Sequence, residues 1–273
     1  MNTLQKIIAH KHQQVAEQRS LYPVQLLERS VHFTAPVVSL KRYICRPDKT
    51  GIIAEIKKRS PSAGIINADV SVEELSVAYM QAGASALSVL TDSAFFGGCN
   101  SDLLVVRTAN FCPILRKDFI VDEYQLLEAR SIGADAVLLI AAAHTPQRVR
   151  ELAAFARSLQ LEAVLEIHDE TELGHINEFT DVVGVNNRNL HDFSIGLDTS
   201  MELLSLIPGE LVKISESGID TPQQALQLKQ AGADGFLIGT AFMKQTDPGK
   251  ACASFITGYK QLLYADQSVR AEV

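Results

Sequence analysis

The sequence predicts an α/β protein, a single (β/α)8 TIM barrel with an N-terminal helical extension. Two observations indicate this fold. The first is a pattern shared by residues 82–91, 132–141 and 231–240, in which a glycine at a helix end leads into a short apolar run. Glycine is favoured just past a helix C-terminus, and a wholly apolar run suits a strand covered on both faces. The pattern is therefore typical of a parallel sheet.

The second observation is the spacing of the apolar, β-rich runs, which recur at intervals of roughly 20 to 35 residues. They begin near Gly51, Ala86, Pro113, Ala136, Glu162, Val182, Leu211 and Gly235. Eight such strands joined by helical crossovers can close into a barrel that leaves no sheet edge exposed. An open doubly wound sheet is the alternative, but that fold more often has about five or six strands and a glycine-rich first turn.

Helix-start signals lie between these runs. Ser71–Glu74 and Thr221–Gln224 have the capping-box pattern, and Thr145 is followed by a proline at the first helical position. Strands and helices are therefore expected to alternate through the barrel.

The chain is expected to divide into an N-terminal helical extension packed on the barrel (1–48), the catalytic barrel (49–265) and a C-terminal tail (266–273). The extension has a partial apolar stripe, formed by Leu4, Ile7, Ile8 and Val15. Residues 41–51, which contain a proline and a glycine, are the expected linker into the first strand.

Bulk composition limits the classes of function. Of the 273 residues, 47% are hydrophobic and 21% are charged, which is the balance of a folded, soluble protein with a sizeable core. The net charge of −7 disfavours a nucleic-acid surface, because phosphates along a duplex are neutralised by a basic patch. An anionic ligand would need a local site.

Cysteines and histidines give no sign of a metal centre. The cysteines lie far apart, without a CxxC pair, at Cys45, Cys99, Cys112 and Cys252. This spacing indicates neither a zinc site nor a disulfide framework and favours a reducing compartment. Loop or supporting roles are expected for His144, His168 and His191.

The first residues lack the apolar run of a secretory signal, and no run of about 18 apolar residues occurs, so we expect a cytoplasmic protein that binds no membrane.

Charged side chains follow the strands at their carboxyl ends, where barrel enzymes place their catalytic residues. Glu55 and Lys57 are two apart on the first strand, so both point to the same side, into the expected barrel mouth. The alternative is an internal ion pair that only fills the barrel.

On the third strand, alternation lets either Arg116 or Lys117 face inward but not both, and parity alone does not choose. A lysine in a partly desolvated pocket has a lowered pKa and can act as a general acid or a Schiff-base nucleophile, whereas an arginine cannot. Lys117 is therefore the better catalytic candidate, and a plain surface lysine is the alternative.

The fifth strand ends in Glu166, and the sixth ends in Asn186 followed by Arg188. A carboxylate inside a barrel needs a partner, so Glu166 is expected to pair with Lys117 or Lys57, which would tune the pKa values of the groups involved.

A phosphate site is expected in the loops after the last two strands. Barrels usually bind phosphate there with backbone N–H groups and the N-terminus of a short helix. The candidate residues are Ser217, Gly218, Gly239 and Thr240. Glycines that only make tight turns are the alternative.

Six motifs in this order make the chain resemble the indole-3-glycerol phosphate synthase family, from about residue 49 to residue 263. They are EIKKRSPS (55–62), PILRKDFI (113–120), LEIH (165–168), VNNRNL (185–190), SESGI (215–219) and LIGT (237–240). The phosphate loops alone are shared with sister barrels such as phosphoribosylanthranilate isomerase, whereas the first two motifs are specific to the synthase. The N-terminal extension also matches. Ala63 and Ile214 depart mildly from the family pattern, at positions without a catalytic role.

The resemblance implies an enzyme of tryptophan biosynthesis that closes 1-(2-carboxyphenylamino)-1-deoxyribulose 5-phosphate to an indole, with loss of CO2 and water and without a metal or organic cofactor. It implies that Lys117 is the general acid that protonates the ribulose carbonyl. Glu166 would stabilise positive charge on the nitrogen-bearing intermediate, while Lys57 and Glu55 would assist the dehydration. The expected partner is the small phosphorylated substrate.

The resemblance also assigns substrate contacts. Positioning roles fall to Asn186, Glu216 and Ser217, and Arg188 with Lys57 would hold the carboxylate and phosphate charges. The remaining substrate-binding residues are expected to be Ser60, Phe96, Phe119, Leu138, Gly218, Ile238, Gly239 and Thr240. Two other hypotheses are a sister isomerase, which needs only one acid and one base, and a degenerate barrel that serves as a binding subunit, which would be expected to have lost Lys117 or Glu166.

Overall fold

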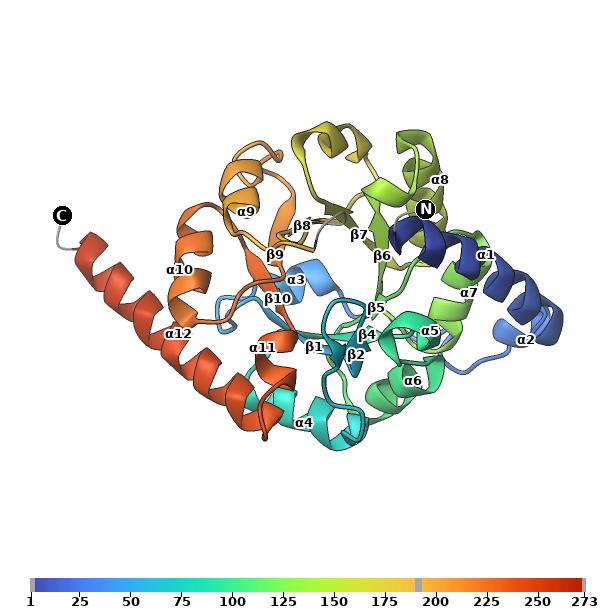
Figure 1. Ribbon diagram of the computed structural model, residues 1–273, viewed down its shortest axis with the longest axis horizontal. Helices are drawn as coiled ribbons and strands as arrows, with labels where there is room; N and C mark the ends of the chain where they lie inside the picture. The colour runs from blue at the N-terminus through green and yellow to red at the C-terminus, as the bar shows by residue number, and fades with distance from the viewer. Residues whose placement is uncertain (1–2, 190–192, 272–273) are drawn as a thin grey trace.

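The computed structural model describes residues 3–189 and 193–271, and its centre is a closed barrel of parallel strands surrounded by helices (Figure 1). Around the barrel the strands follow the order β1-β10-β9-β8-β7-β6-β5-β4. Their bounds are β1 Ile52–Ile56, β4 Ala86–Leu90, β5 Ile114–Lys117, β6 Ala136–Ile140, β7 Glu162–Ile167, β8 Val182–Asn186, β9 Val212–Glu216 and β10 Gly235–Ile238. Each strand begins within one residue of its expected start, and the predicted (β/α)8 fold is confirmed.

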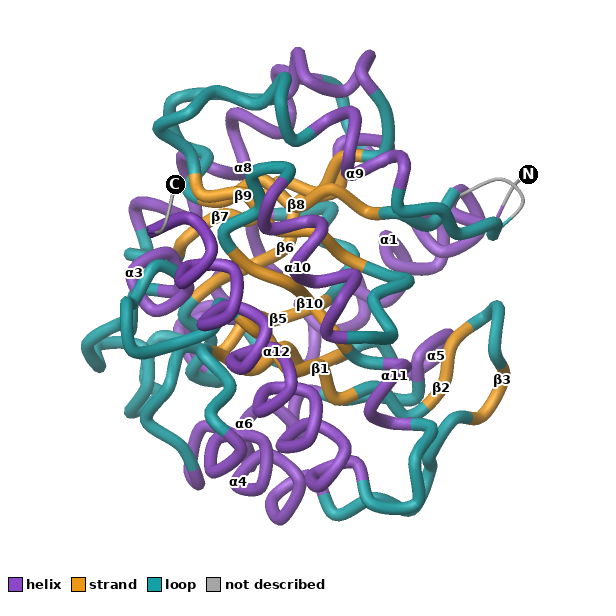
Figure 2. The backbone as a smooth tube through the Cα atoms, turned by 90° about the vertical axis from the view of Figure 1, so that its left-hand side faces the viewer, coloured by secondary structure: helices purple, strands orange, loops and turns teal. Residues whose placement is uncertain are grey.

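Helices and short turns connect these strands, and further helices follow the last strand. They are α4 Val72–Ala82, α5 Ser93–Phe96, α6 Asn100–Ala109, α7 Glu123–Ser131, η1 Ala141–Ala143, α8 Pro146–Ser158, η2 Glu170–His175, α9 Asp198–Leu203, α10 Pro222–Gln230, α11 Thr240–Met243 and α12 Pro248–Ala271. The predicted caps form: Ser71 and Thr145 accept backbone hydrogen bonds, and Thr221 makes a complete capping box with Gln224. A small antiparallel hairpin, β2 (Arg59–Ser60) and β3 (Gly64–Ile65), follows β1 and lies beside α5 (Figure 2).

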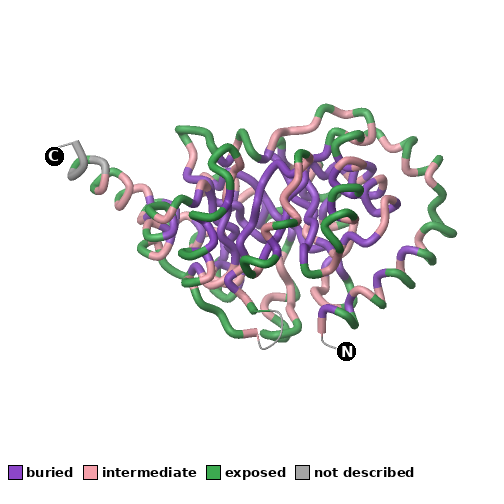
Figure 3. The backbone as a smooth tube through the Cα atoms, turned by 90° about the horizontal axis from the view of Figure 1, so that it is seen from above, coloured by how far each residue is buried: buried purple, intermediate pink, exposed green. Residues whose placement is uncertain are grey.

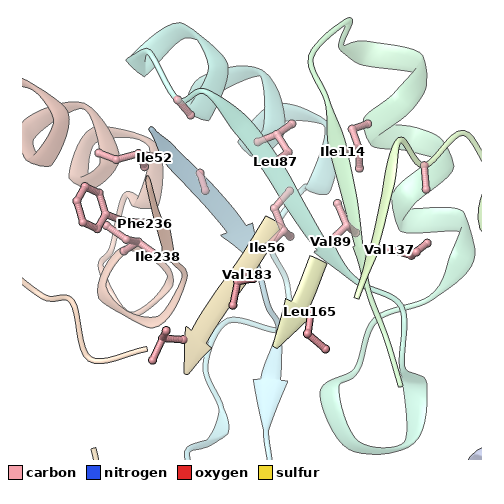
Figure 4. Close-up of a cluster of buried hydrophobic side chains, with 14 of the residues drawn as sticks. Ile52, Ile56, Leu87, Val89, Ile114, Val137, Leu165, Val183, Phe236 and Ile238 are labelled. Carbon is pink, nitrogen blue, oxygen red and sulfur yellow. The ribbon is translucent and has the colours of Figure 1, made fainter. Parts of the chain in front are cut away.

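The apolar core has two layers, because alternate residues of each strand face opposite sides of the sheet. Outward-facing side chains such as Ile52, Leu87 and Phe236 pack against the helices (Figure 4). Inward-facing side chains such as Ile53 and Leu115 fill the barrel itself. At the carboxyl ends of the strands the inward-facing positions carry charged side chains. The polar residues of β1, β5, β7 and β9 therefore face one another at this end of the barrel.

The N-terminal extension forms α1 Thr3–Leu21, α2 Val24–Leu27 and α3 Leu40–Ile44. Three residues of the predicted stripe on α1, namely Leu4, Ile7 and Val15, are buried, and α1 contacts α7 and η1. The expected linker 41–51 is only partly a linker, since it contains most of α3. Leu40 and Ile44 are buried against the inward-facing cluster of the barrel, so α3 closes the N-terminal end of the barrel.

The C-terminal helix α12 packs on α4 and α10, and its last turns extend away from the barrel (Figure 3). The expected boundary at residue 265 falls within this helix. Within the described residues, no helix is long and apolar enough to cross a membrane.

Candidate active site

A cavity of about 500 Å³ opens at the carboxyl ends of the barrel strands. Every site residue expected from the sequence lines it: Glu55, Lys57, Ser60, Phe96, Lys117, Phe119, Leu138, Glu166, Asn186, Arg188, Glu216, Ser217, Gly218, Ile238, Gly239 and Thr240. The structure therefore brings these residues together, and their individual roles stay predictions.

Lys117 is the centre of the charged cluster in this cavity. Its ammonium nitrogen lies 2.9 Å from Oε2 of Glu166 and also contacts Oε2 of Glu216. The structure settles the parity of β5, because Arg116 points outward, where it donates to the carbonyl oxygen of Gln125. Of the two partners expected for Glu166, the structure has Lys117.

Glu55 and Lys57 form an ion pair at 2.6 Å. Both side chains line the cavity, so the pair is part of the cavity wall and does more than fill the barrel. Glu55 is also in close contact with Gly239, because a Cβ added there would lie 2.5 Å from Oε1 of Glu55. The loop after β10 thus needs a residue without a side chain at this point.

The loop after β9 has an unusual backbone. Ser217 and Gly218 have φ values of +67° and +73°, and a non-glycine residue in this region is strained, a feature that clusters at functional sites. The amide of Asn187 stabilises the loop by donating to the carbonyl oxygen of Ser217 at 3.0 Å. After β10, Thr240 is the first residue of α11, with Gly239 at its N-cap. Backbone groups of both loops border the cavity.

Apolar side chains form another part of the wall. The rings of Phe96 and Phe119 lie 5.8 Å apart, and Leu138 reaches the cavity from β6. Asn186 ends β8 and Arg188 follows it, and the Asn186 side chain accepts the backbone N–H of Arg188 at 3.0 Å. The cavity therefore offers aromatic surface, cations and carboxylates together.

A family model described as indole-3-glycerol phosphate synthase matches residues 4–255. The chain belongs to the indole-3-glycerol phosphate synthase family. This match begins in α1, so it includes the N-terminal extension as well as the barrel. The predicted class, a carboxy-lyase of tryptophan biosynthesis, is confirmed, and neither the sister isomerase nor the degenerate barrel is supported.

Curated relatives carry the same name. The indole-3-glycerol phosphate synthase of Bacteroides thetaiotaomicron is 45% identical, over 93% of this chain and 97% of its own length. That of Laribacter hongkongensis is 42% identical, over 92% of this chain and 97% of its own length.

Solved structures share the fold at low identity. A thiamine phosphate pyrophosphorylase from Pyrococcus furiosus has a TM-score of 0.59 at 15% identity, covering 82% of this chain and 100% of its own. A tryptophan synthase complex from Pyrococcus furiosus has a TM-score of 0.58 at 15% identity, covering 77% of this chain and 97% of its own.

The electrostatics of this synthase site correct one expectation. The pKa of Lys117 was expected to be lowered. Burial does act in that direction, but the surrounding carboxylates outweigh it and raise the pKa above its ordinary value. The ammonium is therefore fully protonated before substrate binds.

The two carboxylates on Lys117 differ in their proton affinity. Burial raises the pKa of both, but Lys117 and His168 outweigh it at Glu166 and hold its pKa below the ordinary range. At Glu216, burial dominates and raises the pKa to about 7. One carboxylate is thus firmly ionised, and the other can hold a proton near neutrality.

Sequence reasoning missed two parts of the synthase site. Thr3, Leu4 and Ile7 of α1 line the cavity, although their apolar spacing indicated only packing on the barrel. His168, expected as a loop or supporting residue, directly follows β7 and faces Glu166 at 3.3 Å. Its position two residues after Glu166, on the same side of the strand, was the signal that could have shown this.

The other histidines stay outside the charged cluster. His144 contacts the carbonyl oxygen of Ile120 at 2.8 Å, and His191 lies outside the described residues. No group of three or more His, Cys, Asp or Glu in the described chain could hold a metal ion.

Proposed function

We propose that the chain converts 1-(2-carboxyphenylamino)-1-deoxyribulose 5-phosphate into indole-3-glycerol phosphate, with Lys117 as the general acid of ring closure. The observation that supports this role is the place of Lys117, whose side chain is only 12% exposed and lines the cavity with two carboxylates as neighbours. Such a group is fixed in position and carries its proton, as general acid catalysis requires. We place this activity in the cytoplasm, since the cysteines are free thiols.

We assign the substrate phosphate to the loops after β9 and β10. Backbone groups at Ser217 and Gly218 border one side, and the start of α11 at Thr240 borders the other. Backbone N–H groups at such positions bind anions well. The anthranilate ring would then lie against Phe96 and Phe119, at the other side of the cavity.

We assign the anthranilate carboxylate to Lys57 and Arg188. Both cations line the cavity, and neither is fully buried, so each can turn toward an arriving anion. Asn186 and Glu216 end the neighbouring strands β8 and β9, which lead to Arg188 and to the first phosphate loop, so they are suited to orient the ribulose chain.

Ring closure joins the aromatic carbon that bears the carboxylate to the ribulose carbonyl carbon. Lys117 gives its proton to the carbonyl oxygen, which becomes a hydroxyl group. The ring loses its aromaticity, and positive charge develops toward the nitrogen, where the ionised Glu166 stabilises it. When CO2 leaves, the electron pair of the broken bond returns to the ring.

Dehydration completes the indole. Lys57 donates a proton to the hydroxyl group, which leaves as water, and Glu55 takes a proton from the carbon beside the nitrogen. These two groups lie 2.6 Å apart, so the proton donor and the proton acceptor that the elimination needs are held side by side.

The test is the turnover of purified protein, measured by the fluorescence of the indole product. Lys117→Met should lower kcat about 10²- to 10⁴-fold with little change in KM, because a positioned proton donor acts on the transition state.

Lys117→Arg is the matched variant and should not restore kcat, because arginine keeps the charge but does not release its proton near neutral pH. A near-normal kcat in the Arg variant would reduce Lys117 to an electrostatic role. A near-normal kcat in the Met variant would remove it from the mechanism and leave Lys57 as the acid.

A further inference from the structure

His168 is held between two carboxylates. Its Nε2 faces Oε1 of Glu166 at 3.3 Å, and its Nδ1 faces Oε2 of Glu172, in η2, also at 3.3 Å. Glu172 is fixed in turn, because the same oxygen accepts the backbone N–H of His168 at 2.7 Å. The His168 side chain is only 9% exposed, so water competes little for these contacts.

This arrangement selects the charged form of the ring. A neutral imidazole has one donor nitrogen and one acceptor nitrogen, whereas an imidazolium has a donor on each. The Nδ1 atom hydrogen-bonds to Glu172, whereas Nε2 faces Glu166 at ion-pair distance without hydrogen-bond geometry. A carboxylate facing each nitrogen therefore favours the cation. Burial lowers the pKa of His168, but Glu166 and Glu172 outweigh it and raise the pKa to about 10.

The two carboxylates on Lys117 are consequently unequal. Each presents its Oε2 atom to the ammonium, but their second oxygens differ. Oε1 of Glu166 faces the imidazolium. Oε1 of Glu216 is buried without a hydrogen-bond partner among the described residues, close to the Cα of Gly184, where a side chain would clash with it.

Two like charges close together disfavour each other, so a proton is best held by the carboxylate with the weaker support. That carboxylate is Glu216, whose free oxygen can carry it without losing an ion pair. Glu55 adds further negative charge near Glu216 and strengthens this preference.

We propose that His168 is a positioning residue that determines which of the two carboxylates in contact with Lys117 stays ionised. Its imidazolium keeps Glu166 as the anion and leaves Glu216 to exchange a proton with Lys117. This inference rests on the proposed role of Lys117 as the acid. It assigns the neutral partner from which Lys117 regains its proton after each turnover, and it explains why one carboxylate alone serves as the charge stabiliser.

Other charged groups surround these elements. Within the described chain, Asp169, Asp198 and Arg188 line a second cavity that also borders His168. The groups that directly face the ring are Glu166 from β7 and Glu172 from η2. The experiment therefore changes the ring and its far carboxylate separately.

The direct test is the ¹⁵N NMR titration of His168 in the full chain, assigned with His168→Gln. We expect both ring nitrogens to stay protonated from pH 5 to about pH 9, since opposite charges at this distance shift a pKa by about 1 to 3 units. Glu172→Gln should lower the titration midpoint by at least one unit while it keeps an acceptor for the backbone N–H. An ordinary midpoint near pH 6.5 in the unaltered protein would overturn the proposal, whatever the fate of Lys117.

The kinetic test is the pH profile of kcat. In His168→Gln the acid limb, which reports ionisation of Glu166, should move to higher pH by about one to three units, with a smaller move in Glu172→Gln and little change in KM. His144→Gln is the control, because it removes a nearby histidine that contacts a carbonyl oxygen and no carboxylate. An unmoved limb in His168→Gln, or an equal move in His144→Gln, would contradict the inference.

Discussion

At the scale of single residues, alternation along the strands predicted the cluster well. Glu55, Lys57 and Glu166 were assigned to the barrel mouth from their positions alone, and each lines the cavity. The direction of the Lys117 pKa could not be predicted in this way. It depends on carboxylates from β7 and β9, which are distant in sequence, and parity says which way a side chain points but not what it meets.

Thr240 provides a residue-scale test of the phosphate site. A side chain at Gly239 would not give a clean result, because its Cβ would displace Glu55, which is also proposed to take part in the dehydration. Thr240→Glu should raise KM about 10- to 100-fold, since it adds a negative charge at the proposed phosphate site.

Thr240→Gln has nearly the same size without the charge and should raise KM far less. KM and inhibition by inorganic phosphate would be measured for both variants. Equal KM values would place the phosphate elsewhere.

At the scale of elements, local signals were sufficient for the strands and for the capped helices of the barrel, because caps and apolar runs act within a few residues. They were insufficient for α3. A helix of five residues has too few hydrogen bonds to be stable alone, and α3 persists because Leu40 and Ile44 are buried by the barrel. Such a helix is set by tertiary contacts, and the composition of its segment resembled a linker.

The helix α1 is joined to the barrel by a buried ion pair that the sequence did not reveal. Lys11, 1% exposed, lies 2.9 Å from Asp92 and 2.7 Å from Asp118. Asp92 caps α5 by accepting the backbone N–H groups of Phe95 and Phe96. Asp118 directly follows Lys117. The ion pair therefore joins the N-terminal helix to the two segments that carry Phe96 and Phe119.

Lys11→Met should lower the free energy of unfolding by about 3 to 5 kcal/mol, because it leaves the buried Asp92 without its cation and Asp118 with Arg116 alone. KM should rise as well, since Phe96 loses its fixed support.

Lys6→Met changes an exposed lysine of the same helix and should have little effect on either quantity. Chemical denaturation and steady-state kinetics would compare the two variants. Equal stability would show that α1 does not depend on this ion pair.

At the scale of the whole molecule, eight regularly spaced strands admit few arrangements, which is why a barrel could be predicted from spacing alone. Closure then brings together strand ends that are far apart in sequence, and the cavity follows from it. The contribution of α1 to the cavity wall could not be predicted, because nothing in the repeat of the barrel fixes where an added helix crosses it.

We expect catalysis to be independent of divalent metal, because the charges in the cavity are balanced by lysines, Arg188 and His168. Activity measured after prolonged treatment with a chelator should equal that of untreated protein. A loss of activity that a divalent ion restores would contradict this expectation.

The closure of the N-terminal end of the barrel by Leu40 and Ile44 has a consequence for the traffic of molecules. Substrate, CO2, water and product share the opening at the carboxyl ends of the strands. CO2 and water, which form before the product is released, have to pass the bound indole on their way out. Product that stays at this opening blocks the next substrate, so release of the indole product has to precede each new binding event.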